Sequence, residues 1–350
     1  MTEMPEVLIQ TTPGTPPGMA PDMAPGAGDL LSDLLESMHV TGMVLFRAEF
    51  REPWSVTSAD SGQLAAMLAL GSSRVIPFHI VGAGSCLLAL PGREPVRLDS
   101  GDAVVLPSGG VHRLGGCGDS AAPVHIGQLL PQLPWTGMPV VEHGGGGAST
   151  SIVCGFIRCD ELLFHPVLGH LPEVLHIRPD STPSDQWLAT TIRHTVNEAG
   201  KPQPGWRTML PRLTELMFVE ILRKHMQTLT AGEVGWLAAC NDAVAGPALK
   251  LLHAAPLEDW TLERLARGVG VSRTVLGERF KHFLDQPPMQ YLGHWRLQLA
   301  ARHLKSSELP IKTIADHARY ESEAAFSRAF KRRFGLPPGD WRRKQARTQG

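Results

Sequence analysis

The chain has 350 residues, which is too long for one small domain and predicts about two. It is 43% hydrophobic and 19% charged, a composition that excludes disorder throughout the chain. No run of 18 apolar residues occurs, which excludes a transmembrane helix, and the acidic residues Glu3 and Glu6 argue against a secretory signal. Five unevenly spaced cysteines form no disulfide framework. We therefore expect a cytoplasmic protein without a membrane partner.

The net charge of −1 conceals an uneven distribution. Residues 256–350 hold 18 Lys and Arg against 10 Asp and Glu, whereas the rest of the chain holds 15 against 24. A basic segment joined to an acidic remainder is typical of a nucleic-acid-binding module carried by another domain. A basic surface can also be merely solvated, so charge alone leaves both interpretations open.

The texture of the sequence divides the chain into four regions. Residues 1–28 are rich in Pro and Gly without periodicity, and we expect a disordered tail. Residues 29–180 carry short apolar runs broken by Gly and Pro, which predict the strands of a β-barrel or sandwich. Residues 181–235 show two helical apolar faces, which form either a dimerisation element or a plain packing pair. Residues 240–345 are predicted to be all-helical.

The C-terminal region contains an internal repeat of about 50 residues. Its members recur 49 or 50 positions later: Leu262, Leu265, Ala266, Val269, Val271, Ser272, Leu276, Phe280 and Lys281 become Ile311, Ile314, Ala315, Ala318, Tyr320, Ser322, Phe326, Phe330 and Lys331. Each copy predicts a short helix, a turn and a second helix that Ser272 or Ser322 can cap. Two such helices with a shared apolar seam form a helix-turn-helix.

A long amphipathic helix is predicted between the two copies, beginning at Pro287 and Pro288. Its length of about 19 residues corresponds to roughly 28 Å. One turn of B-DNA is about 34 Å, so this helix could hold two recognition helices in successive major-groove segments. The alternative is an ordinary helical domain with a duplicated hairpin, which leaves the basic charge unexplained.

Both copies together resemble the DNA-binding domain of AraC/XylS-type transcription regulators. The resemblance covers about residues 245–345 and rests on Gly270, Val271, Ser272, Phe280, Lys281, Pro288, Tyr291, Arg296, Ala300, Ile311, Ile314, Ala315, Tyr320, residues 326–331, Phe334, Gly335, Pro337 and Pro338. Asp285 and Arg319 depart from the pattern, since the family usually has glycine at these helix ends. A positive φ at either residue would cost about 1 kcal/mol.

The resemblance implies which residues contact DNA. The base-reading positions are Arg273, Thr274, Gly277 and Glu278 in the first recognition helix and Glu323, Ala324, Ser327 and Arg328 in the second. Arg can contact guanine with two hydrogen bonds, whereas Gly277 has no side chain, so we expect more direct readout from the second helix. Lys281, Lys331, Arg332 and Arg333 are expected to contact phosphates. For Glu278 and Glu323, a solvated carboxylate or an intrahelical pair remains an alternative.

The segment 101–112 is similar to the second motif of the cupin barrel, and the segment 78–84 resembles a degraded first motif. Cupin enzymes hold a metal through two or three histidines and a carboxylate. No carboxylate follows His79 at ligand spacing, so we expect no enzyme. The rival interpretation is a cupin-type metalloenzyme, an oxygenase or isomerase, fused to a DNA-binding domain.

Three residues of the cupin-like domain are candidate metal ligands. His79 and His112 are expected to point inward, and Cys154 lies in a segment that looks like the Cys-Gly strand of cupin-bearing regulators. Together they would suit one zinc or other transition metal, and oxidation of Cys154 would couple metal release to an oxidant. Alternatively, hydrogen bonds satisfy the histidines and Cys154 is a small buried hydrophobe.

These features predict separate α and β domains: a cupin-like β-barrel, a helical linker and an all-α double helix-turn-helix. The function predicted is a one-component, sequence-specific transcription regulator whose cupin-like domain senses a small molecule, metal or oxidant. Expected partners are double-stranded promoter DNA, RNA polymerase and a second copy in a homodimer. An architectural DNA-binding protein with an inert barrel is a further alternative, and it would bind DNA equally with or without a signal.

Overall fold

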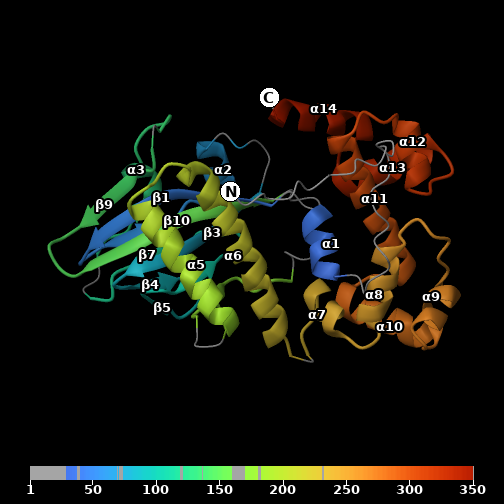
Figure 1. The fold of residues 1–350 in the computed structure, drawn as a ribbon, viewed down its shortest axis with the longest axis horizontal. Coiled ribbons are helices and arrows are strands. Elements are labelled where there is room, and N and C mark those ends of the chain that lie inside the picture. The colour runs from blue at the N-terminus through green and yellow to red at the C-terminus, as the bar shows by residue number, and fades with distance from the viewer. Residues whose placement is uncertain are drawn as a thin grey trace, which may run out of the picture.

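A computed structural model describes residues 29–37, 40–68, 70, 74–118, 121–135, 137–159, 170–179, 183–230 and 232–349. The tail predicted at residues 1–28 lies outside these described residues. Figure 1 shows a half built from strands, covered on one face by two long helices, beside a half built only from helices. The predicted separation of α and β structure is thus confirmed.

The strands of the N-terminal half form two sheets. They are β1 (Thr41–Arg51), β2 (Ser55–Thr57), β3 (Arg74–Ala83), β4 (Ser85–Ala89), β5 (Val96–Asp99), β6 (Ala103–Val105), β7 (Arg113–Gly115), β8 (Val124–His125), β9 (Val140–Gly144), β10 (Ser149–Cys159) and β11 (Leu175–Ile177). The strand orders are β11-β6-β3-β10-β1-β9 and β5-β4-β7-β2-β8. Because no ladder joins the two sheets within the described residues, the domain is a two-sheet sandwich, and the expected closed barrel was wrong in this detail.

Side chains on β3 and β10 alternate between two cores, as the two-residue period of a strand requires. Phe78 and Ile80 face outward into the core shared with the helices, as does Val153. Cys154 points the other way, into the core between the two sheets, and His79 lines the cavity found there. The same alternation that places apolar residues under the helices therefore places the candidate ligands inside the sandwich.

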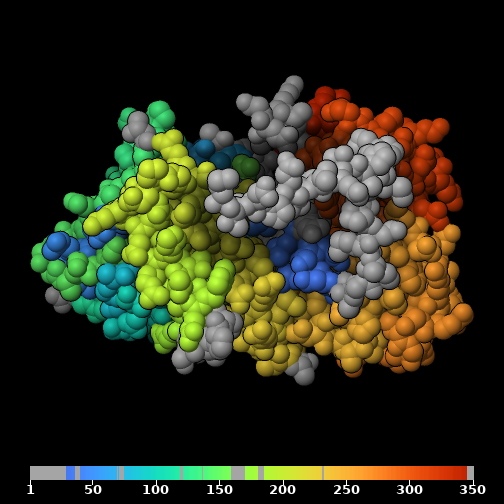
Figure 2. All heavy atoms as spheres, viewed as in Figure 1, coloured from blue at the N-terminus to red at the C-terminus, as the bar shows by residue number. Residues whose placement is uncertain are grey.

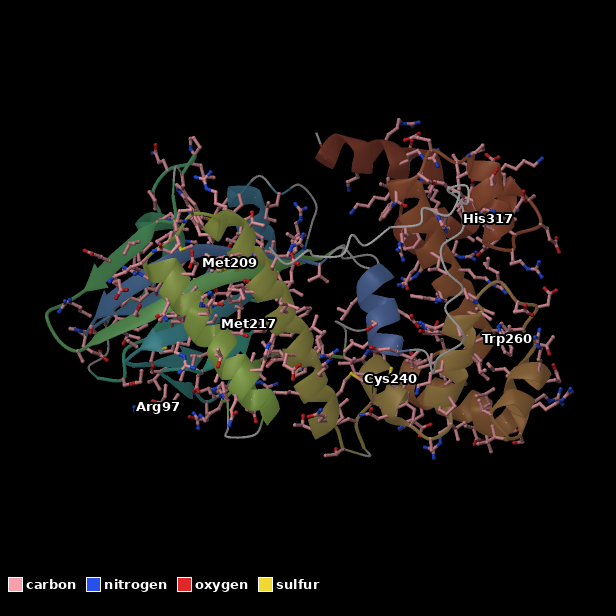
Figure 3. All side chains as sticks on the ribbon, in the orientation of Figure 1. Arg97, Met209, Met217, Cys240, Trp260 and His317 are labelled. Atoms are coloured by element: carbon pink, nitrogen blue, oxygen red, sulfur yellow. The ribbon has the colours of Figure 1, made fainter. Side chains whose placement is uncertain are left out.

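The N-terminal half of the sequence also contains five helices. They are α1 (Leu30–Ser37), α2 (Ser61–Met67), α3 (Ile126–Leu129), α5 (Pro183–Gly200) and α6 (Trp206–Thr228), among the residues that the structure describes, and all except α1 pack on the strands. The long pair α5 and α6 packs on β1, and α5 also packs on β3. Figure 3 labels Met209 and Met217, both on α6: Met217 is buried against the sheet side, whereas Met209 is exposed. The predicted helix pair thus has an inner apolar face and some apolar residues outside it.

The C-terminal half consists of α7 (Trp236–Asn241), α8 (Ala245–Ala254), α9 (Leu262–Gly268), α10 (Arg273–Leu284), α11 (Pro288–Ser306), α12 (Ile311–His317), α13 (Glu323–Phe334) and α14 (Pro338–Gln349). The two predicted helix-turn-helix units are α9–α10 and α12–α13. Ser272 caps α10 by accepting a hydrogen bond from the backbone N–H of Val275, and Ser322 caps α13 through Ala325. Both predicted caps are confirmed.

The linking helix α11 begins at Pro288, as predicted, and has 19 residues. Its buried face, which includes Leu292 and Trp295, contacts helices of both units. At the helix ends, Asp285 and Arg319 adopt φ values of 53° and 62°. The two departures from the family pattern therefore stand in the left-handed conformation that glycine tolerates best.

The short helix α1 precedes the first strand in sequence but packs against the other half of the molecule. Its residues Leu30, Leu31 and Leu34 are buried, and the helix contacts α8 and α11. Figure 2 shows the atoms of α1, in blue, between the atoms of α6 and those of the C-terminal helices. A segment from the N-terminal side of the chain thus contributes to the core of the helical half.

Candidate DNA interface and effector cavity

The predicted base-contact residues lie on the two recognition helices α10 and α13. Arg273, Thr274 and Glu278 are exposed on α10, while Glu323 and Arg328 are exposed on α13. Ser327 is half-buried on α13. Each helix begins after a capping serine whose hydroxyl accepts a hydrogen bond from the backbone N–H three residues further on. The two recognition helices therefore have equivalent places in their helix-turn-helix units but expose different side chains.

The basic side chains of the first unit are paired within the protein. Arg273 donates a hydrogen bond to Glu263 of α9 over 2.5 Å, and this contact lowers the pKa of the Glu263 carboxyl. Lys281 pairs with Asp285, and Arg279 lies 3.6 Å from Asp242. Three cations of α10 are therefore partly neutralised by carboxylates of the same chain.

The second recognition helix carries its cations differently. Among the residues that the structure describes, Arg328, Lys331 and Arg332 have no carboxylate partner, and all three are exposed. Arg333 is half-buried beside the ring of Phe334, and this burial lowers the pKa of its guanidinium. Three of the four cations on α13 are thus available to an external anion, whereas Arg333 lies partly in the core.

A cavity of about 60 Å³ lies between the two sheets. Most of its wall is apolar and is formed by Leu45, Phe46, Phe50, Val56, Ala59, Leu64, Pro77, Leu114, Ile126, Leu130 and Gly155. Its polar wall consists of Ser58, His79, His112 and Cys154. A cavity of this size can hold a small, mainly apolar molecule of a few heavy atoms. The polar side chains at one part of its wall can form hydrogen bonds with that molecule.

The register of the sheet brings the three candidate ligands together. Cys154 of β10 lies directly opposite His79 of β3, and the Cys154 Sγ is 3.1 Å from the His79 Nδ1. His112 precedes β7 and places its Nε2 2.7 Å from the Nε2 of His79. Gly155 permits this arrangement, because a Cβ there would collide with the Met43 carbonyl and the Phe78 ring. His79, His112 and Cys154 thus form one buried cluster.

The hydrogen bonds of the cluster have a single consistent direction. The Nδ1 of His112 lies 3.1 Å from the carbonyl oxygen of Gly110, which can only accept, so this nitrogen carries the proton. Burial lowers the pKa of His112 to about 4 and that of His79 well below its ordinary value, so both rings are neutral at pH 7. His79 Nε2–H must then donate to His112, and the Cys154 S–H must donate to His79 Nδ1.

This geometry does not fit one metal ion held by all three residues. His112 and Cys154 approach opposite nitrogens of the His79 ring, so an ion at either nitrogen is out of reach of the third ligand. No group of three or more His, Cys, Asp or Glu side chains within the described ranges is arranged to hold a metal. Binding of zinc would require the His79 ring to turn.

Two partners of these sites were not predicted from the sequence. Ser58 accepts a hydrogen bond from the backbone N–H of His112 and lies 2.9 Å from the His112 Nδ1, yet it is 54 residues away in the chain. Glu263, the partner of Arg273, belongs to the preceding helix. Neither residue is one of the positions that carry the repeat or the cupin-like motifs, so only the pairing of strands and helices reveals these contacts.

Comparison with known proteins agrees with this architecture. The family model described as Cupin matches residues 29–227, and the model described as Helix-turn-helix domain matches residues 265–344. An AraC-like transcription regulator from Streptomyces antibioticus is 34% identical over 306 residues, which cover 86% of this chain and 97% of that relative. The HTH-type transcriptional regulator AlkR from Acinetobacter baylyi is 30% identical over 272 residues, covering 76% and 87% of the two chains.

Among solved structures, the DNA-binding domain of AdpA in complex with a target DNA matches 30% of this chain and 98% of that chain, at 27% identity and a TM-score of 0.28. None of the helices formed by described residues is long and apolar enough to cross a lipid bilayer. The two matched domains and the full-length similarity to named regulators show that the chain belongs to the AraC-type family of DNA-binding transcription regulators with an N-terminal cupin domain.

Proposed function

We propose that this regulator responds to a small, mainly apolar effector bound between the two sheets, and that the effector alters how α10 and α13 bind promoter DNA. The observation that carries the proposal is the cavity, whose wall is apolar except for Ser58, His79, His112 and Cys154. Ligand pockets typically combine such a wall with a few polar groups that orient the ligand.

A physical route connects the cavity to the DNA-binding half. β3 and β10 carry the polar cluster on one face and contact the core of α5 and α6 on the other. α6 in turn contacts α7, the first helix of the C-terminal half. Because packed interfaces switch between discrete arrangements, a ligand that moves these strands would shift the position of α6.

The test uses DNA sites selected from a random library with the full-length protein. Fluorescence anisotropy of a selected site, measured with and without small cyclic ketones and hydrocarbons, should show a change in Kd with at least one compound. Ala59→Val, which adds two methyl groups at the cavity wall, should abolish the change without altering basal binding. Equal binding with and without every compound would favour an architectural protein with an inert sandwich.

We further propose that the regulator is a homodimer that pairs through the outer face of α6. Met209 and Leu216, seven residues apart on that face, are large, apolar and exposed, and Trp187 of α5 is exposed as well. A dimer that binds two half-sites would place four recognition helices on DNA. Leu216→Glu should convert the dimer to a monomer in analytical ultracentrifugation, whereas Leu257→Glu, at an exposed leucine of the helical half, should not.

Metal and oxidant sensing make a different prediction for the same cluster. Elemental mass spectrometry should find about one zinc or other transition metal per chain if the His79 ring turns to bind it, and His112→Ala should lose that metal. Release by mild oxidant would indicate a role for Cys154. We favour the apolar effector because the cluster is already satisfied by its own hydrogen bonds.

We infer that the chain is not an enzyme, because the relatives are named as regulators and no described residue lining the cavity carries a carboxylate. We place it in the cytoplasm, where promoter DNA and RNA polymerase are its partners. A metal-dependent oxygenase or isomerase activity of the purified protein would overturn this assignment.

A further inference from the structure

We propose that Cys154 is a covalent modification site for small apolar α,β-unsaturated carbonyl compounds that enter the cavity between the sheets. The inference rests on the proposed function, in that the cavity must admit an apolar effector. It adds a chemical class of ligand, a reacting atom and a path for the proton.

The thiol of Cys154 combines access to the cavity with isolation from water. Its side chain lines the cavity, yet the residue is buried, and this burial raises the pKa of the thiol. Cys117, by contrast, is exposed on the surface. Polar reagents should therefore meet Cys117 first, and only a molecule that the apolar wall accepts can reach the sulfur of Cys154.

A proton acceptor stands directly beside this thiol. The S–H of Cys154 points to the Nδ1 of His79 over 3.1 Å, and the Nε2–H of His79 points to the Nε2 of His112 over 2.7 Å. As the sulfur attacks, His79 can take the thiol proton on Nδ1 while passing its other proton to His112. The positive charge then rests on His112, next to the Gly110 carbonyl oxygen, instead of beside the sulfur.

Ser58 supplies a hydrogen-bond donor for a carbonyl group. Its oxygen accepts from the backbone N–H of His112, and the His112 Nδ1–H faces both this oxygen and the Gly110 carbonyl. Because that nitrogen is itself a donor, the Ser58 hydroxyl proton is not used by the cluster. No acceptor for this proton is found among the described residues. A carbonyl oxygen in the cavity would supply one, and the bond would stabilise the enolate formed during attack.

The reaction is an addition that balances without another reactant. The sulfur electron pair of Cys154 forms a bond to the β-carbon, the carbon–carbon π bond breaks, and its electrons move to the enolate. The proton taken by the His79–His112 pair returns to the α-carbon. The product is a thioether that contains all atoms of thiol and ligand, and nothing is oxidised or reduced overall.

The first experiment treats the full chain with 2-cyclopenten-1-one and follows adduct formation by intact-protein and peptide mass spectrometry. This six-heavy-atom enone matches a cavity of about 60 Å³, which corresponds to roughly four to six water positions. In a background that carries both Cys117→Ser and Cys159→Ser, we expect one adduct, located on Cys154 and absent in Cys154→Ser. Cyclopentanone fits the same space but cannot react with a thiol in this way, so it should slow adduct formation by competing for the cavity.

The role of the cluster is tested by rate. His79→Gln should slow the addition about 100-fold or more, as expected for loss of a general base, and Ser58→Ala should slow it independently. Circular dichroism establishes that each variant is folded, and Ser58→Ala tests the mechanism if His79→Gln is not. Iodoacetamide, which is polar, should label Cys154 much more slowly than it labels Cys117 in the wild-type chain.

The outcomes separate this inference from the proposed function. If cyclopentanone raises the melting temperature but the enone forms no adduct on Cys154, the effector cavity stands and the covalent site is wrong. If neither compound binds, both proposals fail. Modification of Cys86 or Cys240 before Cys154, or equal labelling of Cys154 by iodoacetamide, would also overturn the covalent site.

Discussion

At the scale of single residues, Arg319 adopts a backbone conformation that is unfavourable for any residue with a Cβ. Its φ of 62° lies in the left-handed region, whereas the corresponding turn of the first unit has Gly270 at 73°. Arg319→Gly should therefore be more stable than Arg319→Ala by about 1 kcal/mol, because both lose the exposed contact with Asp259 and only glycine escapes the steric penalty. Urea unfolding of both variants gives this difference.

The comparison with alanine isolates the backbone effect, since neither variant has a guanidinium. An alanine variant as stable as the glycine variant would mean that the turn relaxes out of the left-handed region. The sequence located this residue correctly, because the repeat aligns Arg319 near Gly270. It did not reveal the partner Asp259, which lies 60 residues earlier.

A second residue-scale prediction concerns His253, which is buried and stacked on Trp295. Trp236 donates to the Tyr291 hydroxyl, which then donates to the Nε2 of His253, so the ring accepts there as a neutral group. Burial lowers the pKa of His253 to about 3. The unfolded chain binds this proton below about pH 6.5 and the folded chain does not, so stability falls as the pH drops from 6.5 towards 3.

We expect this histidine to contribute about 2 kcal/mol to the loss of stability between pH 7 and pH 5. His253→Gln, which keeps an acceptor for Tyr291, should remove that part of the loss when urea unfolding is measured at both values. His282→Gln, at an exposed histidine of α10, is the matched control and should leave the pH dependence as it is. An unchanged dependence in His253→Gln would show that the ring is protonated in the folded state.

At the scale of elements, the two recognition helices differ in how their arginines are held. Arg328 of α13 has no carboxylate partner among the described residues, whereas Arg273 of α10 is held by Glu263. Arg328→Ala should weaken binding to a selected DNA site by about 1–3 kcal/mol and relax specificity at one base. Arg273→Ala should cost less, because its wild-type contact with DNA first requires separation from Glu263.

Removal of the ion pair between Arg273 and Glu263 provides a control. Glu263→Gln should strengthen DNA binding by releasing Arg273, and this gain should vanish in the Arg273→Ala background. If Arg328→Ala weakens binding to all DNA sequences equally, Arg328 contacts a phosphate and not a base. Lys331→Ala is the reference for that behaviour, since loss of one phosphate contact should reduce the slope of log K against log salt by about one.

The elements themselves were largely predictable, because their signals are local. Apolar spacing located both helix-turn-helix units, and Ser272 and Ser322 marked the starts of α10 and α13. The pairing of strands was not predictable, since the order of β3, β10 and β1 depends on contacts between distant segments. The contact between His79 and Cys154 follows from that pairing. The tautomer of each ring depends on the position of the Gly110 carbonyl, which no sequence pattern predicts.

At the scale of the whole molecule, the two structural halves do not correspond to two continuous segments of the chain. α1 belongs by sequence to the region of the cupin domain, yet its buried leucines complete the core of the helical half. The charge does not follow this division, since α1 lies in the acidic part of the sequence, whereas the basic part begins at residue 256. Asp33 of α1 faces the ring of His253 at 3.8 Å, too far for a hydrogen bond.

This arrangement predicts that weakening α1 loosens the helical half and leaves the sheets unaffected. Leu31→Ala with Leu34→Ala removes two buried side chains that should together stabilise docking by several kcal/mol, since each such truncation costs about 2–5 kcal/mol. Backbone amides of α8 and α11, which α1 contacts, should exchange with deuterium faster, while those of β3 and β10 keep their wild-type rates. Leu257→Ala, at an exposed leucine, controls for loss of a leucine elsewhere. Faster exchange throughout both sheets would instead show that α1 stabilises the two halves as one cooperative unit.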